Sequence, residues 1–139
     1  MKRSTQRVRD EDVASIQQTI AELARIFHAR DVAGIMSHFR EDAVYVDIFG
    51  VPNVGSDSIL AAATLYLIEA PEDAALRFDV VNIAFVRNDV AAVTVRHDPI
   101  TTDGEILVGE PVGQSMFVMS HEKADWKIAV WQLTVIGRR

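Results

Sequence analysis

Apolar side chains recur at helical spacing in the first part of the chain. Over residues 10–29 they stand three or four positions apart, which places them on one face of an α-helix that Asp10 can cap: Val13, Ile16, Ile20, Leu23 and Phe27. The same spacing predicts a second, short helix over residues 31–39. A third helix is expected from residue 56 or 57, and Pro71 ends it because proline cannot continue a helix.

Strand patterns account for most of the remaining chain. A short apolar run of β-type residues, 43–49, separates the second predicted helix from the third. From residue 76 onward we expect four strands, over 76–86, 90–97, 112–120 and 126–136. In the first of these the apolar positions change parity after Val80, which predicts a β-bulge and a bent strand. The pair Asp103-Gly104 predicts a hairpin tip between the second and third strands.

This order of elements predicts an α+β fold. Three helices and one early strand come first, and a meander of four long strands follows. We expect a cone-shaped, strongly curved antiparallel sheet with the three N-terminal helices packed on its concave side. The open end of such a cone is a favoured place for a small hydrophobic ligand. One parity of each late strand is also apolar, which predicts a homodimer formed through the sheet.

The composition narrows the setting of this fold. The chain has 139 residues, which suits a single domain, expected over residues 10–139. The basic segment 1–9 is expected to be a disordered tail, with a docking arm for an acidic partner as the alternative. A net charge of −6 argues against nucleic acid and membranes as partners. The absence of cysteine excludes disulfides and fits a cytoplasmic location.

Asp47 is the first candidate for chemistry. It lies in the apolar run Val-Tyr-Val-Asp-Ile-Phe, where burying a free carboxylate is costly, so it could line a pocket and act as a proton shuttle. The alternative is a structural carboxylate at a strand end, capped by backbone amides or paired with an arginine. Tyr45, two residues earlier, points to the same side of a strand. It could donate to a ligand oxygen, or pack in the core with a hydrated hydroxyl.

Other residues could complete a ligand pocket. His97 is the best histidine for acid–base work, although a core or rim histidine is the plainer interpretation. Gln114 could line the pocket or bond a neighbouring element, and Trp131 could line it or bury in a subunit contact. Further apolar wall is expected from three more residues: Phe27, Tyr66 and Met116. No metal-ligand spacing and no nucleotide-binding motif occurs, so neither metal nor cofactor is expected.

Several segments carry a family resemblance. Residues 27–31 and 34–43 resemble the opening of the cone-shaped superfamily of nuclear transport factor 2, which includes SnoaL-like polyketide cyclases and ketosteroid isomerases. Further segments resemble the SgcJ/EcaC subgroup, some of whose members accompany enediyne and other polyketide biosynthesis: 44–50, Gly55, 85–91, 114–119 and 126–129. The resemblance covers about residues 10 to 136.

This resemblance implies a site, with departures. Asp47 aligns with the aspartate that serves as catalytic base in ketosteroid isomerases. Leu23 stands where these enzymes have a tyrosine donor, and Gln114 stands where they have a protonated aspartate, so the constellation is at best half present. Subgroup members also often carry a histidine near Thr64 and an asparagine near Leu133.

Three functions follow from these observations. In the first, Asp47 shuttles a proton on an apolar, oxygenated, polyketide-like or polyene-like molecule while Tyr45 and Gln114 orient an oxygen of that molecule. The reaction is then an isomerisation, cyclisation or hydration without a cofactor. In the second, the protein binds or delivers such a molecule unchanged, which the missing donors favour. In the third, it is a protein–protein association module, which a filled cavity would favour.

Overall fold

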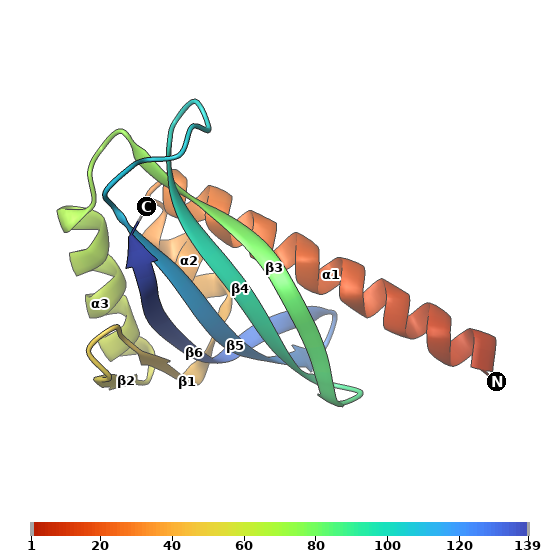
Figure 1. Cartoon of the computed structure of the whole chain (residues 1–139). Coiled ribbons are helices and arrows are strands. Elements are labelled where there is room, and N and C mark those ends of the chain that lie inside the picture. The colour runs from red at the N-terminus through yellow and green to blue at the C-terminus, as the bar shows by residue number, and fades with distance from the viewer. Residues whose placement is uncertain (1, 139) are drawn as a thin grey trace.

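One sheet of six strands, in the order β2-β1-β6-β5-β4-β3, forms one layer of the molecule, and three helices form the other (Figure 1). The computed structural model describes residues 2–138 and the side chains of residues 9–138. The helices are α1 (Lys2–His28), α2 (Val32–Ser37) and α3 (Ser56–Glu69). The strands are β1 (Phe39–Val46), β2 (Pro52–Val54), β3 (Ala74–Arg87), β4 (Val90–Thr101), β5 (Pro111–Glu122) and β6 (Asp125–Arg138). The predicted α+β fold class is therefore confirmed.

The sheet is mixed, whereas an antiparallel sheet was expected. Neighbouring strands are antiparallel except β1 and β6, which run parallel, with Tyr45 paired to Trp131. No hairpin joins these two strands, because most of the chain lies between them, so chain connectivity does not force them to be antiparallel. The predicted bulge in β3 is confirmed, since the register shifts between Val80 and Asn82.

The helices lie on one face of the sheet. Figure 1 shows α1 crossing behind β3 and β4, while the face toward the viewer carries no helix among the described residues. The fully buried apolar side chains of α1 meet those of the inner sheet face in one core cluster that includes Ile16, Ile20, Leu23, Val93, Val95, Phe117, Met119 and Ile128. The inner face of the sheet is thus sealed by helices, whereas the outer face is not.

α1 is longer than the sequence predicted. It begins at Lys2 rather than at Asp10, so the segment expected to be a disordered tail forms its first turns. No glycine or proline interrupts that segment, and Arg9 ties it to the sheet. The guanidinium of Arg9 lies 3.9 Å from the ring centroid of Phe85, and its Nη2 donates to Oδ1 of Asn88 at 3.3 Å. None of the described helices is long and apolar enough to cross a membrane.

The caps of the other two helices follow the sequence. Oδ1 of Asp31 accepts a hydrogen bond from the backbone N–H of Gly34 at 3.0 Å, which caps α2. Gly55 precedes α3 with a φ of +86°, a conformation that favours glycine. α3 buries only Ile59 and Leu67 completely, and its apolar side chains on other faces stay exposed. It therefore packs more loosely than α1.

Arg30 fastens the end of α3. Its side chain donates to the carbonyl of Leu67 and, at 3.1 Å each, to the carbonyls of Ala70 and Pro71. These carbonyls lie at and just after the last turn of α3, where intrahelical partners run out. A cation is also favourable at the negative end of a helix.

Candidate functional site

Eight ring side chains form a connected group between the sheet and the helices, which we call the aromatic cluster: Phe27, Phe39, Tyr45, Tyr66, Phe78, His97, Phe117 and Trp131. Trp131 on β6 is its centre. The indole ring lies 4.7 Å from Phe117, 5.1 Å from Tyr45 and 5.8 Å from Phe27, measured between ring centroids. The cluster thus joins α1, α3 and five strands.

A buried polar group lies within this cluster. Nε2 of His97 is 2.5 Å from Oγ of Ser115, and Nε1 of Trp131 donates to the same Oγ at 2.7 Å. His97 is 4% exposed and Ser115 is 2% exposed, so both are removed from bulk water. Three polar side chains on β4, β5 and β6 therefore bond one another inside an otherwise apolar core. Asp98, next to His97, pairs instead with Arg96 and Arg77, at 3.0 Å and 3.5 Å.

Burial sets the ionisation of the polar rings. It lowers the pKa of His97 to about 4, against a smaller opposing effect of Asp98. It also raises the pKa of Tyr45 to about 12, with smaller contributions from Asp47 and Tyr66. The pKa of Tyr66 is raised by burial as well, although the residue is 42% exposed. Near neutral pH the cluster therefore holds an uncharged imidazole and two uncharged phenols.

Asp47 lies just outside the cluster, in the turn that follows β1. The predicted strand over 43–49 is shifted, because β1 already ends at Val46. Oδ1 of Asp47 accepts hydrogen bonds from the backbone N–H groups of Phe49 at 2.9 Å and Val51 at 3.0 Å. This is the backbone-capped carboxylate that the sequence left open as the structural alternative. The side chain still acts electrostatically on Tyr45.

Gln114 and Met116 do not join the cluster. Both alternate along β5 with Ser115 and Phe117, which point inward, so they lie on the outer face of the sheet. Met116 is 42% exposed. The expectation that these two residues line one pocket with Tyr45 is therefore wrong. The apolar run along β5 did not show which parity faces the helices, and Ser115 was missed for that reason.

The two tryptophans show how a bulge changes the side of the sheet to which a side chain points. Their odd separation predicts opposite faces, yet Trp126 and Trp131 are both buried on the inner side. The β5–β6 register shifts between Val118 and Met119, leaving Ala129 unpaired, and this extra residue reverses the alternation. Of the expected wall residues, Phe27 and Tyr66 belong to the cluster, and their rings meet edge to face at 5.8 Å.

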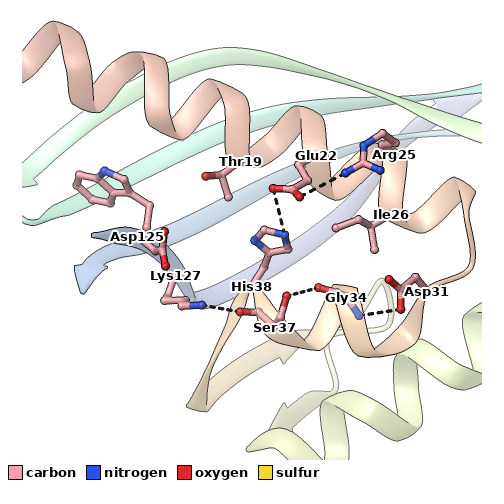
Figure 2. A pocket seen from close by; sticks show the side chains of 11 residues that line it. Thr19, Glu22, Arg25, Ile26, Asp31, Gly34, Ser37, His38, Asp125 and Lys127 are labelled. Carbon is pink, nitrogen blue, oxygen red and sulfur yellow. Dashed lines mark hydrogen bonds and ion pairs between the residues drawn. The ribbon is translucent and has the colours of Figure 1, made fainter. Parts of the chain in front are cut away.

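Two surface clefts lined by described residues lie away from the aromatic cluster. One, of about 370 Å³, is at the start of α3 near Glu41 and Ser56. The other, of about 410 Å³, is a polar cleft between α1, α2 and the beginning of β6 (Figure 2). The space inside the cone is filled by aromatic side chains. This is the outcome that favours a protein–protein association module, and a ligand there must displace at least one of the rings.

The polar cleft contains a further histidine, His38, which follows α2. Nε2 of His38 lies 3.8 Å from Oε2 of Glu22, and Nζ of Lys127 donates to the carbonyl of Ser37 at 2.7 Å (Figure 2). Burial lowers the pKa of His38, with the carboxylate of Glu22 acting in the opposite direction. Among the described residues, no three histidine, aspartate or glutamate side chains group together as metal ligands.

Comparison with protein families identifies the chain. The model of the SnoaL-like domain matches residues 16–136. The chain belongs to the SnoaL-like domain family. No functionally curated protein shows a significant match to its sequence.

Solved structures share the fold of this SnoaL-like domain. A provisionally named scytalone dehydratase from Novosphingobium aromaticivorans is 13% identical, with a TM-score of 0.80 over 96% of this chain and 90% of that one. Aln2 from a Streptomyces species is 15% identical, with a TM-score of 0.76 over 90% and 91% of the two chains. A ketosteroid isomerase-like protein from Erwinia carotovora is 16% identical, with a TM-score of 0.70 over 91% and 98%. At these identities the likeness establishes the fold.

Proposed function

We propose that this SnoaL-like protein binds a small, flat, apolar molecule bearing oxygen within the aromatic cluster. His97 then donates a hydrogen bond to the ligand oxygen and stabilises the charge that develops there in a cofactor-free isomerisation, cyclisation or hydration–dehydration reaction. Polyketide-like intermediates of natural-product biosynthesis fit this description, as the resemblance to the SgcJ/EcaC subgroup suggests. Asp47, beside Tyr45 at the edge of the cluster, is the candidate for moving the proton.

The observation that carries this proposal is the buried polar group around His97. A histidine that is 4% exposed must forgo hydration, and its surroundings lower its pKa to about 4. A core needs no such group for packing, and perturbed titratable residues concentrate at functional sites. The rings of Phe78, Phe117 and Trp131 around it suit a flat ligand once part of the cluster moves aside.

The names of structural neighbours support the reaction class. One is provisionally named a scytalone dehydratase and another is called ketosteroid isomerase-like. Both names denote proton transfer on oxygenated ring molecules. These neighbours share little sequence with this chain, so their names support the class of reaction and not the substrate.

Entry requires part of the cluster to move. Tyr66 is the ring best placed to do so, because it belongs to the loosely packed α3 and is 42% exposed. Swinging Tyr66 away from Phe27 uncovers the ring faces beneath it. Lids of this kind commonly open and close on the microsecond to millisecond timescale.

The test uses two probes and two variants. Binding of 1-tetralone is followed by quenching of tryptophan fluorescence, and isomerisation of cyclohex-3-enone to its conjugated ketone is followed by ultraviolet absorbance. We expect binding by the wild type, and a loss of roughly 10²-fold in turnover in His97→Gln. Asp47→Asn shows whether that carboxylate takes part as well. Failure of the folded wild type to bind 1-tetralone would contradict the proposal.

Non-catalytic binding or delivery is the second candidate. The observation that favours it is the position of Gln114 on the outer face of the sheet, which removes an expected donor from the cluster. Recovery of every bound probe unchanged, with no turnover by the wild type, would select this function over catalysis.

A further inference from the structure

The direction of one hydrogen bond in the buried polar group is fixed by chemistry. Nε1 of an indole carries a hydrogen and has no lone pair to offer, so it can only donate. Trp131 therefore donates to Oγ of Ser115 across their 2.7 Å contact. Oγ of Ser115 is the acceptor in this bond, and its own hydrogen remains available.

The hydroxyl hydrogen of Ser115 has one acceptor within reach. Among the described residues, the hydrogen bonds of Oγ are those to Trp131 and to Nε2 of His97. Because Trp131 cannot accept, the hydroxyl donates to Nε2 of His97. The opposite arrangement, with a hydrogen on Nε2, would direct two donors at Oγ and leave the serine hydrogen without an acceptor in a residue that is 2% exposed. An unsatisfied buried donor of this kind is costly. That arrangement would also leave the lone pair of Nδ1 unpaired among the described residues, whereas donation by Ser115 leaves only Nδ1–H unpaired.

The remaining nitrogen of His97 then carries the proton. A neutral imidazole has one donor and one acceptor nitrogen, so if Nε2 accepts, Nδ1 donates. Nδ1 has no hydrogen-bond partner among the described residues. In the described part of the chain, the one side-chain nitrogen or oxygen that is both fully buried and without a hydrogen-bond partner is Nε1 of Trp126. Nδ1 of His97 also has no partner there, so it is not fully buried. Nδ1–H is therefore the group that His97 can offer to a ligand.

We propose that Trp131 and Ser115 are positioning residues that hold His97 in the tautomer protonated at Nδ1, so that the ring presents an N–H donor to an acceptor oxygen of the ligand. This inference rests on the proposed function for its ligand, although the tautomer itself does not depend on a ligand. It narrows the ligand class to molecules with a carbonyl, quinone or deprotonated hydroxyl oxygen at this point. Alcohols, which would seek an acceptor for their own hydrogen, are disfavoured.

The tautomer is measured directly in the ligand-free protein. Nitrogen-15 labelled histidine gives separate NMR signals for Nδ1 and Nε2, and a protonated ring nitrogen differs strongly in chemical shift from an unprotonated one. At pH 7 we expect Nδ1 of His97 to be protonated and Nε2 not. Ser115→Ala and Trp131→Phe should each release the ring, so that the Nε2 signal moves toward that of a protonated nitrogen. Ser115→Thr, which keeps a hydroxyl, should restore the wild-type shifts.

A matched variant controls for loss of a serine on the same strand. Ser120 also lies on β5 but bonds Glu122, outside the aromatic cluster, so Ser120→Ala should leave the His97 signals unchanged. A protonated Nε2 in the wild type would overturn the proposal whether or not any ligand binds. The same holds for His97 signals that are unmoved in a folded Ser115→Ala protein.

Ligand class is tested with a ketone and its alcohol. Wild-type protein should bind 1-tetralone about tenfold more tightly than 1-tetralol, as expected for one buried hydrogen bond. Ser115→Ala should reduce this preference to less than about threefold, whereas Ser120→Ala should keep it. Equal binding of both probes by the wild type overturns the assignment of the ligand class. Binding of neither probe overturns the proposed function, while the NMR result still decides the tautomer.

Discussion

The ring of Tyr66 meets the ring of Phe27 edge to face, with the two centroids 5.8 Å apart and the planes at 87°. This contact joins α3 to α1 above the remaining rings of the aromatic cluster. Because Tyr66 is partly exposed and Phe27 is buried, the tyrosine lies between solvent and the cluster. Removal of its side chain is the most direct way to open the cone.

Tyr66→Ala should therefore speed ligand entry. We expect 1-tetralone to associate several-fold faster than with the wild type, measured by stopped-flow tryptophan fluorescence, because no ring has to swing aside first. Leu65→Ala is the control, since Leu65 is exposed on the same helix but is not part of the aromatic cluster. Equal association rates in all three proteins would show that entry does not pass Tyr66.

The hydrogen bonds that Arg30 donates to the end of α3 should limit local unfolding of the last turn of this helix. Arg30→Ala removes the donors to the carbonyls of Leu67, Ala70 and Pro71, so amide hydrogen exchange in the last turn of α3 should rise by several-fold. Arg25→Ala serves as control, because Arg25 forms only an exposed pair with Glu22 among the described residues. Exchange that rises equally in both variants would argue against a specific effect of these hydrogen bonds.

His97 should make the protein sensitive to acid. The pKa of His97 is lowered from 6.5 to about 4, so the unfolded chain takes up a proton first as the pH falls. Stability from this group is complete above pH 6.5 and decreases as the pH drops toward 4, by up to about 3 kcal/mol. The lowered pKa of His38 acts in the same direction.

The measurement is urea denaturation between pH 7 and pH 4. His97→Gln should flatten the decline in the free energy of unfolding over this range, while leaving the part that comes from His38. His28→Gln, at an exposed position, should keep the full decline. A wild-type stability that does not fall with pH would contradict the buried neutral state of His97.

The carboxylate of Asp47 should matter first for the turn after β1. Asp47→Ala removes the acceptor for the N–H groups of Phe49 and Val51 and should lower the free energy of unfolding by about 1–2 kcal/mol. Asp47→Asn keeps an oxygen acceptor, so its free energy of unfolding should fall by less than about 0.5 kcal/mol relative to the wild type. Urea denaturation of both variants distinguishes them, and an equal loss in both would contradict an acceptor role.

The homodimer predicted through the sheet stays a prediction, and Met116 offers the test. It lies on the outer face of β5, which no described helix covers. Its neighbours on this face are two half-buried side chains, Thr94 on the paired strand β4 and Val118 two residues along β5. Met116→Glu should convert a dimer to monomer in analytical ultracentrifugation, because the charge would be buried on association. Lys123→Glu, in the β5–β6 turn, is the control. A wild type that sediments as a monomer would contradict the dimer.

The sequence was sufficient for most of the fold but for little of the site. Helix α3, its start after Gly55 and the bulge in β3 all follow from local patterns that act over a few residues. Local patterns do not show which side chains of β5 and β6 point toward the helices, because this depends on the register between strands. One unpaired residue, Ala129, turns Trp131 inward, and Ser115 becomes visible as a partner of His97 only once three strands are aligned.

Asp47 illustrates the other limit. A carboxylate in an apolar run is equally compatible with a pocket and with a turn. In both places hydrogen-bond donors can replace the water that the carboxylate loses on burial. Which of the two applies depends on where the strand ends, and strand ends are set by pairing with β2 and β6 rather than by β1 itself.

The parallel pairing of β1 with β6 has a consequence for how the protein is made. The last strand of the chain lies inside the sheet, between β1 and β5, so the early hairpin of β1 and β2 has no connection to the rest of the sheet until residues 125–138 arrive. During synthesis residues 125–138 must leave the ribosome before the sheet can close. Contacts between such distant segments form slowly. Removal of residues 125–138 should therefore prevent assembly of the whole domain, and not merely disorder one edge of the sheet.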